Sequence, residues 1–387
     1  MTETATRAAP PVTSLPRRAL PALVGYAGVR ALGLAVLAGW SAARGTSAHK
    51  LLSARWDSLW YARVAGAGYG HEVRLPNGDI HSDLAFFPLL PWLERLLHAL
   101  TTLSYADAGL LVSALASLAA AGGIFALADR LYGARAGVCA VLLWAALPVG
   151  VVQSMAYSES LFTALAAWSL FAVVSGRWVT AGLLAALAGL TRPVGAAVVA
   201  AVWVAAAASF GRTGSADGAR APAWRRVLGA AVAPLGAAAY VLWVGHRTGD
   251  GPLGYLDVQA GWRNGFDGGY AFARFAGHLL TAFPSVLAGV ALITGVVLLL
   301  WLYGAGVRRG QPLALLVYSG VVLALALCAS SYFGSKPRLL LPAFPLLFPL
   351  AEALARARPA RAALLAGTLA AGAAVYGAWW LNGSGPP

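Results

Sequence analysis

The sequence has few charged side chains. They make up 11% of its 387 residues, whereas a soluble domain carries about 25%. Hydrophobic residues make up 59%, and no polar stretch is long enough to build a separate soluble domain. This scarcity of charge excludes a soluble globule, because too little polar surface remains to cover one. It predicts a protein embedded in the lipid bilayer.

Cysteine is even scarcer. The chain has two cysteines, Cys139 and Cys328, in apolar segments that we place near opposite faces of the membrane, so we expect no disulfide. Two cysteines exclude a cysteine-rich metal site, and the six histidines show no metal-ligand spacing. We therefore predict neither a metal nor a cofactor.

The net charge of +14 comes almost entirely from arginine, since Lys50 and Lys336 are the only lysines. Short basic loops stay on the cytoplasmic side of a membrane, so the excess of positive charge needs no nucleic-acid partner. The loops assigned to the cytoplasm carry Arg130, Arg135, Arg177, Arg212, Arg220, Arg225, Arg226, Arg308, Arg309, Arg356, Arg358 and Arg361. Two long loops, 44–107 and 247–278, then face the outside. Because 10 of the 14 carboxylates fall on that side, we expect the chemistry there.

Apolar runs of about 20 residues predict about eleven transmembrane helices. They lie at 20–43, 108–129, 136–155, 158–176, 178–191, 194–210, 227–246, 279–303, 312–330, 339–355 and 362–381. The run 178–191 is short and ends at Thr191-Arg192-Pro193, so we expect a broken or re-entrant helix beside a cavity. Arg30 lies in the middle of the first run, with no evident partner. The expected architecture is all-α and polytopic, with a cytoplasmic tail (1–19), one transmembrane domain (20–381) and a C-terminal tail (382–387).

The first outer loop combines an acidic residue with many aromatic side chains. It reads Arg55-Trp56-Asp57-Ser58-Leu59-Trp60-Tyr61, then Gly68-Tyr69, and later Ala85-Phe86-Phe87-Pro88. Residues 85–100 are apolar on one face with Glu94, Arg95 and His98 on the other, which predicts a helix lying in the membrane interface. A carboxylate at such a partly dry edge suits proton transfer. Asp57 is the candidate, and capping of a helix that begins at Ser58 is the alternative.

The second outer loop is also rich in aromatic and polar side chains. It carries Trp262, Arg263, Asn264, Phe266, Asp267, Tyr270 and Phe272. Aromatic rings beside amides and carboxylates suit a sugar-binding surface. A belt of aromatic residues at the membrane interface is the alternative.

Four sequence blocks resemble the PIG-V family of mannosyltransferases, which is named for the enzyme that adds the second mannose of the GPI anchor. The first is the Arg-Trp-Asp-Ser segment with its following aromatic residues. The others are Ala156-Tyr157-Ser158-Glu159-Ser160, Gly189-Leu190-Thr191-Arg192-Pro193, and Lys336-Pro337-Arg338-Leu339 with Phe344-Pro345-Leu346. The blocks follow one another in the family's order. The alanine-rich composition suggests a bacterial member, which leaves the GPI pathway itself in doubt.

This resemblance implies a GT-C fold, a polytopic bundle whose enzymes use a polyprenyl-phosphate sugar as donor. It implies Asp57 as the catalytic base, with Arg192, Lys336 and Arg338 holding the donor phosphate. The remaining candidates for substrate binding are Arg55, Trp56, Tyr61, Tyr69, Phe86, Phe87 and Glu159. For Arg192 the alternative is an ion pair with Glu159, and for Lys336 and Arg338 it is interfacial snorkelling.

The expected function is therefore transfer of a hexose, most simply mannose, at the outer face of the plasma membrane. The expected partners are membrane lipids, the lipid-linked donor, and a glycan, glycolipid or protein acceptor, and no nucleic acid. Two other classes remain open. One is a transporter or flippase, which would need charges along a path through the bilayer. The other is a non-catalytic subunit that binds a lipid-linked glycan.

Overall fold

The computed structural model describes residues 15–211 and 222–385. Most of the expected cytoplasmic tail, together with Arg212, Arg220 and residues 386–387, lies outside the described residues. The first helix, α1, begins at Leu15, and the expected boundary between the tail and the transmembrane domain stays a prediction.

Hydrophobic helices dominate the structure. Five stretches are long and apolar enough to cross a membrane: α1 (Leu15–Ala43), α5 (Tyr105–Tyr132), α10 with α11 (Ala223–Val232 and Leu235–Thr248), α14 (Ser285–Arg308) and α18 (Pro359–Leu381). Four shorter apolar helices accompany them: α7 (Glu159–Val174), α8 (Trp178–Gly189), α9 (Gly195–Gly211) and α15 (Leu313–Cys328). With two bent pairs of helices, the described residues give five to seven candidate spans. The protein is thus all-α and polytopic, and the count of eleven stays a prediction.

Two of the expected spans are broken. The run 136–155 forms α6 (Ala134–Ala145) and a 3-10 helix, η2 (Pro148–Ser154), bent by 88°. Arg30 donates hydrogen bonds to the carbonyls of Ala145 and Gly150 at this break. The expectation of one continuous span is therefore wrong, and Arg30 has a partner after all: it satisfies backbone groups that the break leaves open.

The second broken span lies near the C-terminal end of the chain. A segment of η3 (Phe333–Ser335) and α16 (Lys336–Leu339) is bent by 73° from η4 (Phe344–Leu347) and α17 (Phe348–Arg356). The expected helix 339–355 thus begins late, because Pro342 and Pro345 interrupt the backbone ladder. Trp144 and Tyr318 donate to the carbonyls of Leu341 and Pro342, which fixes the chain just after α16.

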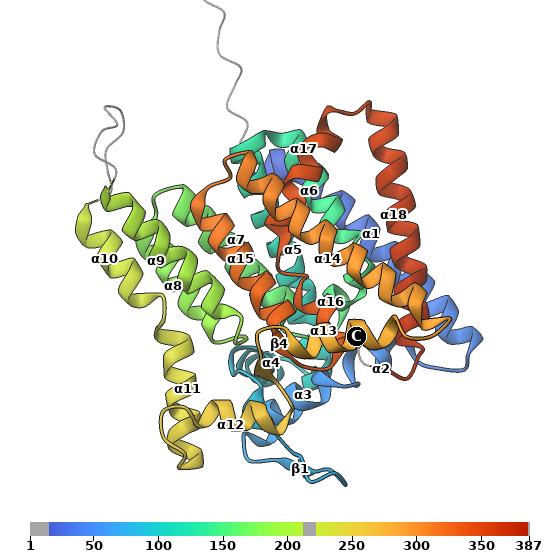
Figure 1. The fold of residues 1–387 in the computed structure, drawn as a ribbon, viewed down its shortest axis with the longest axis vertical. Helices are drawn as coiled ribbons and strands as arrows, with labels where there is room; N and C mark the ends of the chain where they lie inside the picture. The colour runs from blue at the N-terminus through green and yellow to red at the C-terminus, as the bar shows by residue number, and fades with distance from the viewer. Residues whose placement is uncertain (1–14, 212–221, 386–387) are drawn as a thin grey trace, which may run out of the picture.

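The two long loops that the sequence predicts to face outside, here called the first and second outer loops, gather at one end of the bundle, opposite α17 and its turn into α18 (Figure 1). The first contains α2 (Ala48–Ser53), α3 (Asp57–Ala67), the antiparallel strands β1 (Glu72–Arg74) and β2 (Ile80–Ser82), η1 (Asp83–Ala85) and α4 (Leu89–Leu100). The second contains α12 (Gly254–Gly261), β3 (Gly265–Phe266) and α13 (Tyr270–Leu279). Strand β3 pairs with β4 (Ala329–Ser330). This pairing ties the second outer loop to the chain that follows α15.

Helix α4 does not expose its acidic residue as expected. Glu94 is 1% exposed, whereas the apolar side chains of Trp92, Leu96 and Leu100 are on the outside. A Cβ atom at Gly109 of α5 would lie 2.5 Å from the Glu94 carboxyl, so the glycine allows this close approach. Burial raises the pKa of Glu94 to about 9. The carboxyl group is therefore held neutral between two helices rather than presented to water.

Candidate active site

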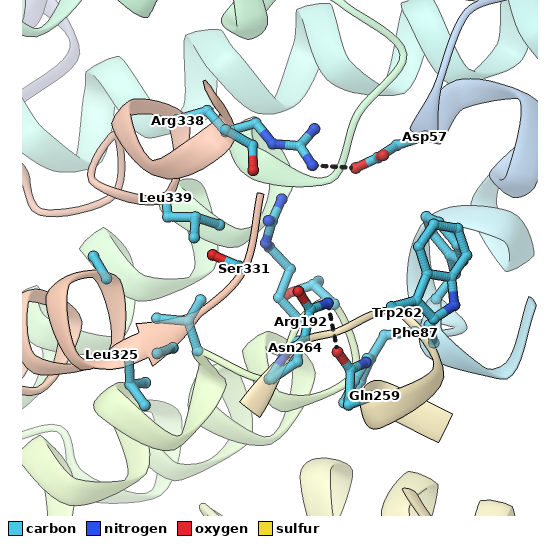
Figure 2. A pocket seen from close by; sticks show the side chains of 18 of the residues that line it. Asp57, Phe87, Arg192, Gln259, Trp262, Asn264, Leu325, Ser331, Arg338 and Leu339 are labelled. Atoms are coloured by element: carbon cyan, nitrogen blue, oxygen red, sulfur yellow. Dashed lines mark hydrogen bonds and ion pairs between the residues drawn. The ribbon is translucent and has the colours of Figure 1, made fainter. Parts of the chain in front are cut away.

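A cavity of about 280 Å³ lies where the two outer loops meet α15 and α16. Its walls come from four parts of the chain that are far apart in sequence. The lining side chains include Asp57, Tyr61, Phe86, Phe87, Thr191, Arg192, Gln259, Trp262, Asn264, Val322, Leu325, Ser331, Arg338 and Leu339. Figure 2 shows the cavity, with Asp57 and Arg338 facing each other across its upper part.

Asp57 stands in the first turn of α3 and points at Arg338. Its Oδ2 atom lies 2.7 Å from Nη2 of Arg338. The residue before it, Trp56, has a positive φ of 52° and makes no side-chain cap. A bulky residue in this region of φ is strained, and such strain gathers at functional sites. Helix α3 begins at Asp57 itself. The Asp57 side chain pairs with Arg338 and does not cap the helix.

Glu159 joins the two arginines of the cavity. Its buried carboxylate, at the start of α7, forms ion pairs with Arg192 and with Nε of Arg338, the latter at 3.7 Å. Arg192 comes from the break between α8 and α9, where the sequence predicts an interrupted helix. Arg192 thus forms an ion pair with Glu159 and also lines the cavity. The expected role of Arg192 and its alternative are therefore compatible.

Arg338 keeps unused hydrogen-bonding capacity. Its Nη1 is buried and has no hydrogen-bond partner among the described residues, and the same holds for the Oγ atom of Ser331. Both residues line the cavity. A buried donor without a partner costs about 1–3 kcal/mol. Such donors beside a cavity suit a ligand that carries oxygen acceptors.

Lys336 does not reach the cavity. Its Nζ atom donates to the carbonyls of Ala326 and Ala329, at 2.8 and 2.6 Å, and it lies near the rings of Phe272 and Phe333. The ammonium group therefore closes the C-terminal end of α15. Lys336 therefore lies outside the cavity lining, and its expected role in binding the donor phosphate stays a prediction.

The expected substrate-binding residues divide into two groups. Tyr61, Phe86 and Phe87 line the cavity. Tyr61 shares a hydrogen bond of 2.8 Å with Ser158, and burial raises the pKa of its hydroxyl group. The hydroxyl is therefore a neutral, fixed part of the wall.

The other expected residues have structural partners outside the lining. Arg55 stacks over the ring of Trp56 at 3.9 Å and donates to the carbonyls of Leu381 and Gly383. Tyr69 donates to the carbonyl of Phe86 at 2.7 Å, and so supports the aromatic wall from behind. Glu159 lies behind the two arginines. We find none of these four among the side chains that face the cavity.

The second outer loop contributes residues that the sequence only partly indicates. Trp262 stacks on His81 with 3.9 Å between ring centroids and donates from Nε1 to the carbonyl of Ser82. Asn264 donates to the side-chain oxygen of Gln259 at 3.0 Å. Gln259 and Ser331 are missed by the sequence interpretation, because a lone polar residue in a loop carries no local signal.

Within residues 15–211 and 222–385, no group of three or more His, Cys, Asp or Glu side chains converges as a metal site would require. Asp83 accepts hydrogen bonds from the backbone N–H groups of Gly70 and His71, so it shapes the first outer loop. The absence of a metal or cofactor stays a prediction.

Comparisons with known proteins agree with the fold. The family described as dolichyl-phosphate-mannose-protein mannosyltransferase matches residues 84–217, about a third of the chain. This segment includes Phe86, Glu159 and Arg192, but neither Asp57 nor Arg338. No curated protein sequence matches the chain.

Two solved structures of ArnT from Cupriavidus metallidurans are similar over most of the chain. The apo structure has a TM-score of 0.51 and 19% identity, and it covers 81% of this chain and 56% of that one. The structure bound to undecaprenyl phosphate has a TM-score of 0.53 and 20% identity, and it covers 87% and 61%. The chain therefore spans about three fifths of their length. These similarities confirm a polytopic membrane protein with a GT-C-like fold, and the PIG-V subfamily stays a prediction.

Proposed function

We propose that this chain is a membrane glycosyltransferase that moves a sugar from a polyprenyl-phosphate carrier to an acceptor hydroxyl group. The observation that carries this proposal is the meeting of one carboxylate, Asp57, with two arginines, Arg192 and Arg338, on a single cavity wall. A general base next to a cationic anion site is what this reaction needs.

In the proposed reaction the two arginines hold the phosphate of the donor. Guanidinium groups bind phosphate oxygens with paired hydrogen bonds. Arg338 Nη1 has capacity for one, and Ser331 Oγ offers a further donor, since neither has a partner among the described residues. Glu159 keeps both guanidinium groups in place.

The chemical step is a direct displacement. The acceptor oxygen attacks the anomeric carbon while the bond from that carbon to the phosphate oxygen breaks. The phosphate leaves with the electron pair, and its new negative charge is stabilised by Arg338 and Arg192. Asp57 takes the proton of the acceptor hydroxyl. No other group is needed to balance the step.

Mannose is the proposed sugar, supported by the matched family's description and by the PIG-V resemblance. The carrier is supported by the undecaprenyl phosphate bound to the similar ArnT structure. We propose that the reaction takes place at the outer face of the plasma membrane. Both outer loops contribute to the cavity wall, and the basic loops are expected on the other, cytoplasmic side. The acceptor is a glycan, a glycolipid or a protein.

The test is sugar transfer by purified protein in lipid nanodiscs, with radiolabelled polyprenyl-phosphate mannose as donor and a membrane extract as acceptor. We expect Asp57→Asn to lower the rate by more than about a hundredfold. Asp250→Asn, a matched change at an exposed residue of the second outer loop, should leave the rate unchanged. If Asp57→Asn still transfers the sugar, another residue is the general base. Binding of the donor without any transfer by the wild type would favour a transporter or binding subunit.

A further inference from the structure

The cavity wall has three parts that differ in charge and polarity. Asp57, Arg192 and Arg338 form a charged part, whereas Val322, Leu325 and Leu339 form an apolar part. A third part, from the second outer loop, is polar but uncharged and aromatic: Gln259, Trp262 and Asn264. In Figure 2 the apolar residues Leu325 and Leu339 lie on one side, Trp262 lies on the other, and the Arg192 side chain lies between them.

A lipid-phosphate sugar has three chemically different parts, and each fits one part of this wall. The phosphate needs cations, and the first carbons of the carrier need an apolar surface. The sugar needs neutral hydrogen-bonding groups and a flat ring to pack against. We infer that Gln259, Asn264 and Trp262 form the subsite for the transferred pyranose. This inference rests on the proposed function.

The two amides hold each other in position and keep free polar atoms. Asn264 Nδ2 donates to Gln259 Oε1 at 3.0 Å, and Gln259 Nε2 donates to the Tyr255 hydroxyl at 2.6 Å. The backbone N–H of Asn264 also bonds to the carbonyl of Gln259 at 2.9 Å. The side-chain oxygen of Asn264 has no hydrogen-bond partner among the described residues. It can accept a bond from a sugar hydroxyl group, in a geometry fixed before the sugar binds.

The backbone between these residues is strained. Arg263 has a φ of 57°, and among the described residues only Trp56 shares a positive φ without being glycine. Each of the two directly precedes a cavity-lining residue, Asn264 and Asp57 respectively. The left-handed conformation places Trp262 and Asn264 on the same cavity wall. The pairing of β3 with β4 and the bond from Arg263 to Asp79 hold it there.

Binding of two lipids separates the sugar subsite from the phosphate site. We would measure the affinity of the protein in nanodiscs for polyprenyl phosphate and for polyprenyl-phosphate mannose. For the mannose lipid we expect Asn264→Ala and Gln259→Ala to weaken binding roughly five- to tenfold, the effect of losing one hydrogen bond. Binding of the bare phosphate lipid should stay unchanged, which also shows that the variants fold. Glu72→Ala, at an exposed residue of β1, is the control.

The outcomes distinguish the two proposals. If both amide variants bind the mannose lipid as tightly as the wild type, the sugar subsite is elsewhere, and the proposed function is untouched. If they lose affinity for both lipids equally, the amides serve the phosphate or the fold, and the inference is wrong. If the wild type binds neither lipid, the proposed function fails, and the inference fails with it.

Discussion

Asp57 and Arg338 neutralise each other at the cavity wall, with 2.7 Å between the carboxylate oxygen and the guanidinium nitrogen. Under the proposed function a phosphate must compete with Asp57 for this arginine. We therefore predict that Asp57→Asn binds polyprenyl phosphate several-fold more tightly than the wild type, a gain on the order of 1 kcal/mol, while transfer is lost. Arg338→Gln should weaken the same binding. If Asp57→Asn binds polyprenyl phosphate no more tightly than the wild type, Asp57 does not compete with the phosphate for Arg338.

Glu159 stabilises the fold as well as the site. Its carboxylate is buried and pairs with both Arg192 and Arg338. Glu159→Gln removes a buried negative charge and leaves two largely enclosed cations with one carboxylate between them, so we expect a loss of about 3 kcal/mol in stability. Thermal unfolding in nanodiscs measures this loss. Glu72→Gln, at an exposed residue of β1, should have no effect, and an equal shift in the two variants would contradict the prediction.

Glu94 makes stability depend on pH. Its folded pKa of about 9 lies above the ordinary 4.5, so between these values the folded protein binds more protons than the unfolded chain. Stability should then fall as the pH rises through this window. Glu94→Gln keeps the shape and removes the titration. We expect its advantage over the wild type to grow by up to about 2–3 kcal/mol between pH 5 and pH 7. Parallel unfolding curves at the two pH values would refute this.

The backbone at Arg263 can be tested with two substitutions. Arg263→Gly and Arg263→Val both remove the ion pair with Asp79, at 2.5 Å, so their difference isolates the conformation. Glycine accepts a positive φ freely, whereas a β-branched residue does not. We expect the valine variant to be less stable than the glycine variant by about 1–2 kcal/mol. Equal melting temperatures would mean that the left-handed conformation is not retained.

Long apolar runs were predictable because a membrane span needs length and hydrophobicity, which are local properties. The run 362–381 matches α18 closely, and the break at Arg192 follows from Pro193 and the short run before it. The breaks after Ala145 and before Phe344 carry a local signal, Pro148 in the first and Pro342 with Pro345 in the second, which a count of apolar residues ignores. The sequence does not reveal that Arg30, from a distant helix, satisfies the carbonyls at the first break.

The site was predictable where a residue had a local signal. An acidic residue among aromatics indicates Asp57, and the sequence blocks that resemble the PIG-V family indicate Arg192 and Arg338. Lys336 carries the same signal, yet it bonds to the carbonyls at the end of α15. Lys336 and Arg338 are two residues apart, and only the three-dimensional path of the backbone determines which of them faces the cavity. The pairing of β3 with β4 holds the second outer loop, which carries Gln259, against the chain that follows α15. No periodicity in the sequence indicates this pairing.

The cluster of Asp57, Glu159, Arg192 and Arg338 holds two negative and two positive charges. These four side chains are together electroneutral, which a partly dry place at a membrane edge tolerates best. In the proposed reaction, the proton that Asp57 gains cancels one negative charge at the moment when the departing phosphate acquires another. The total charge of the cavity is then the same before and after transfer. The electrostatic part of the barrier therefore contains no cost of bringing net charge into the membrane, only that of moving charge from a carboxylate to a phosphate.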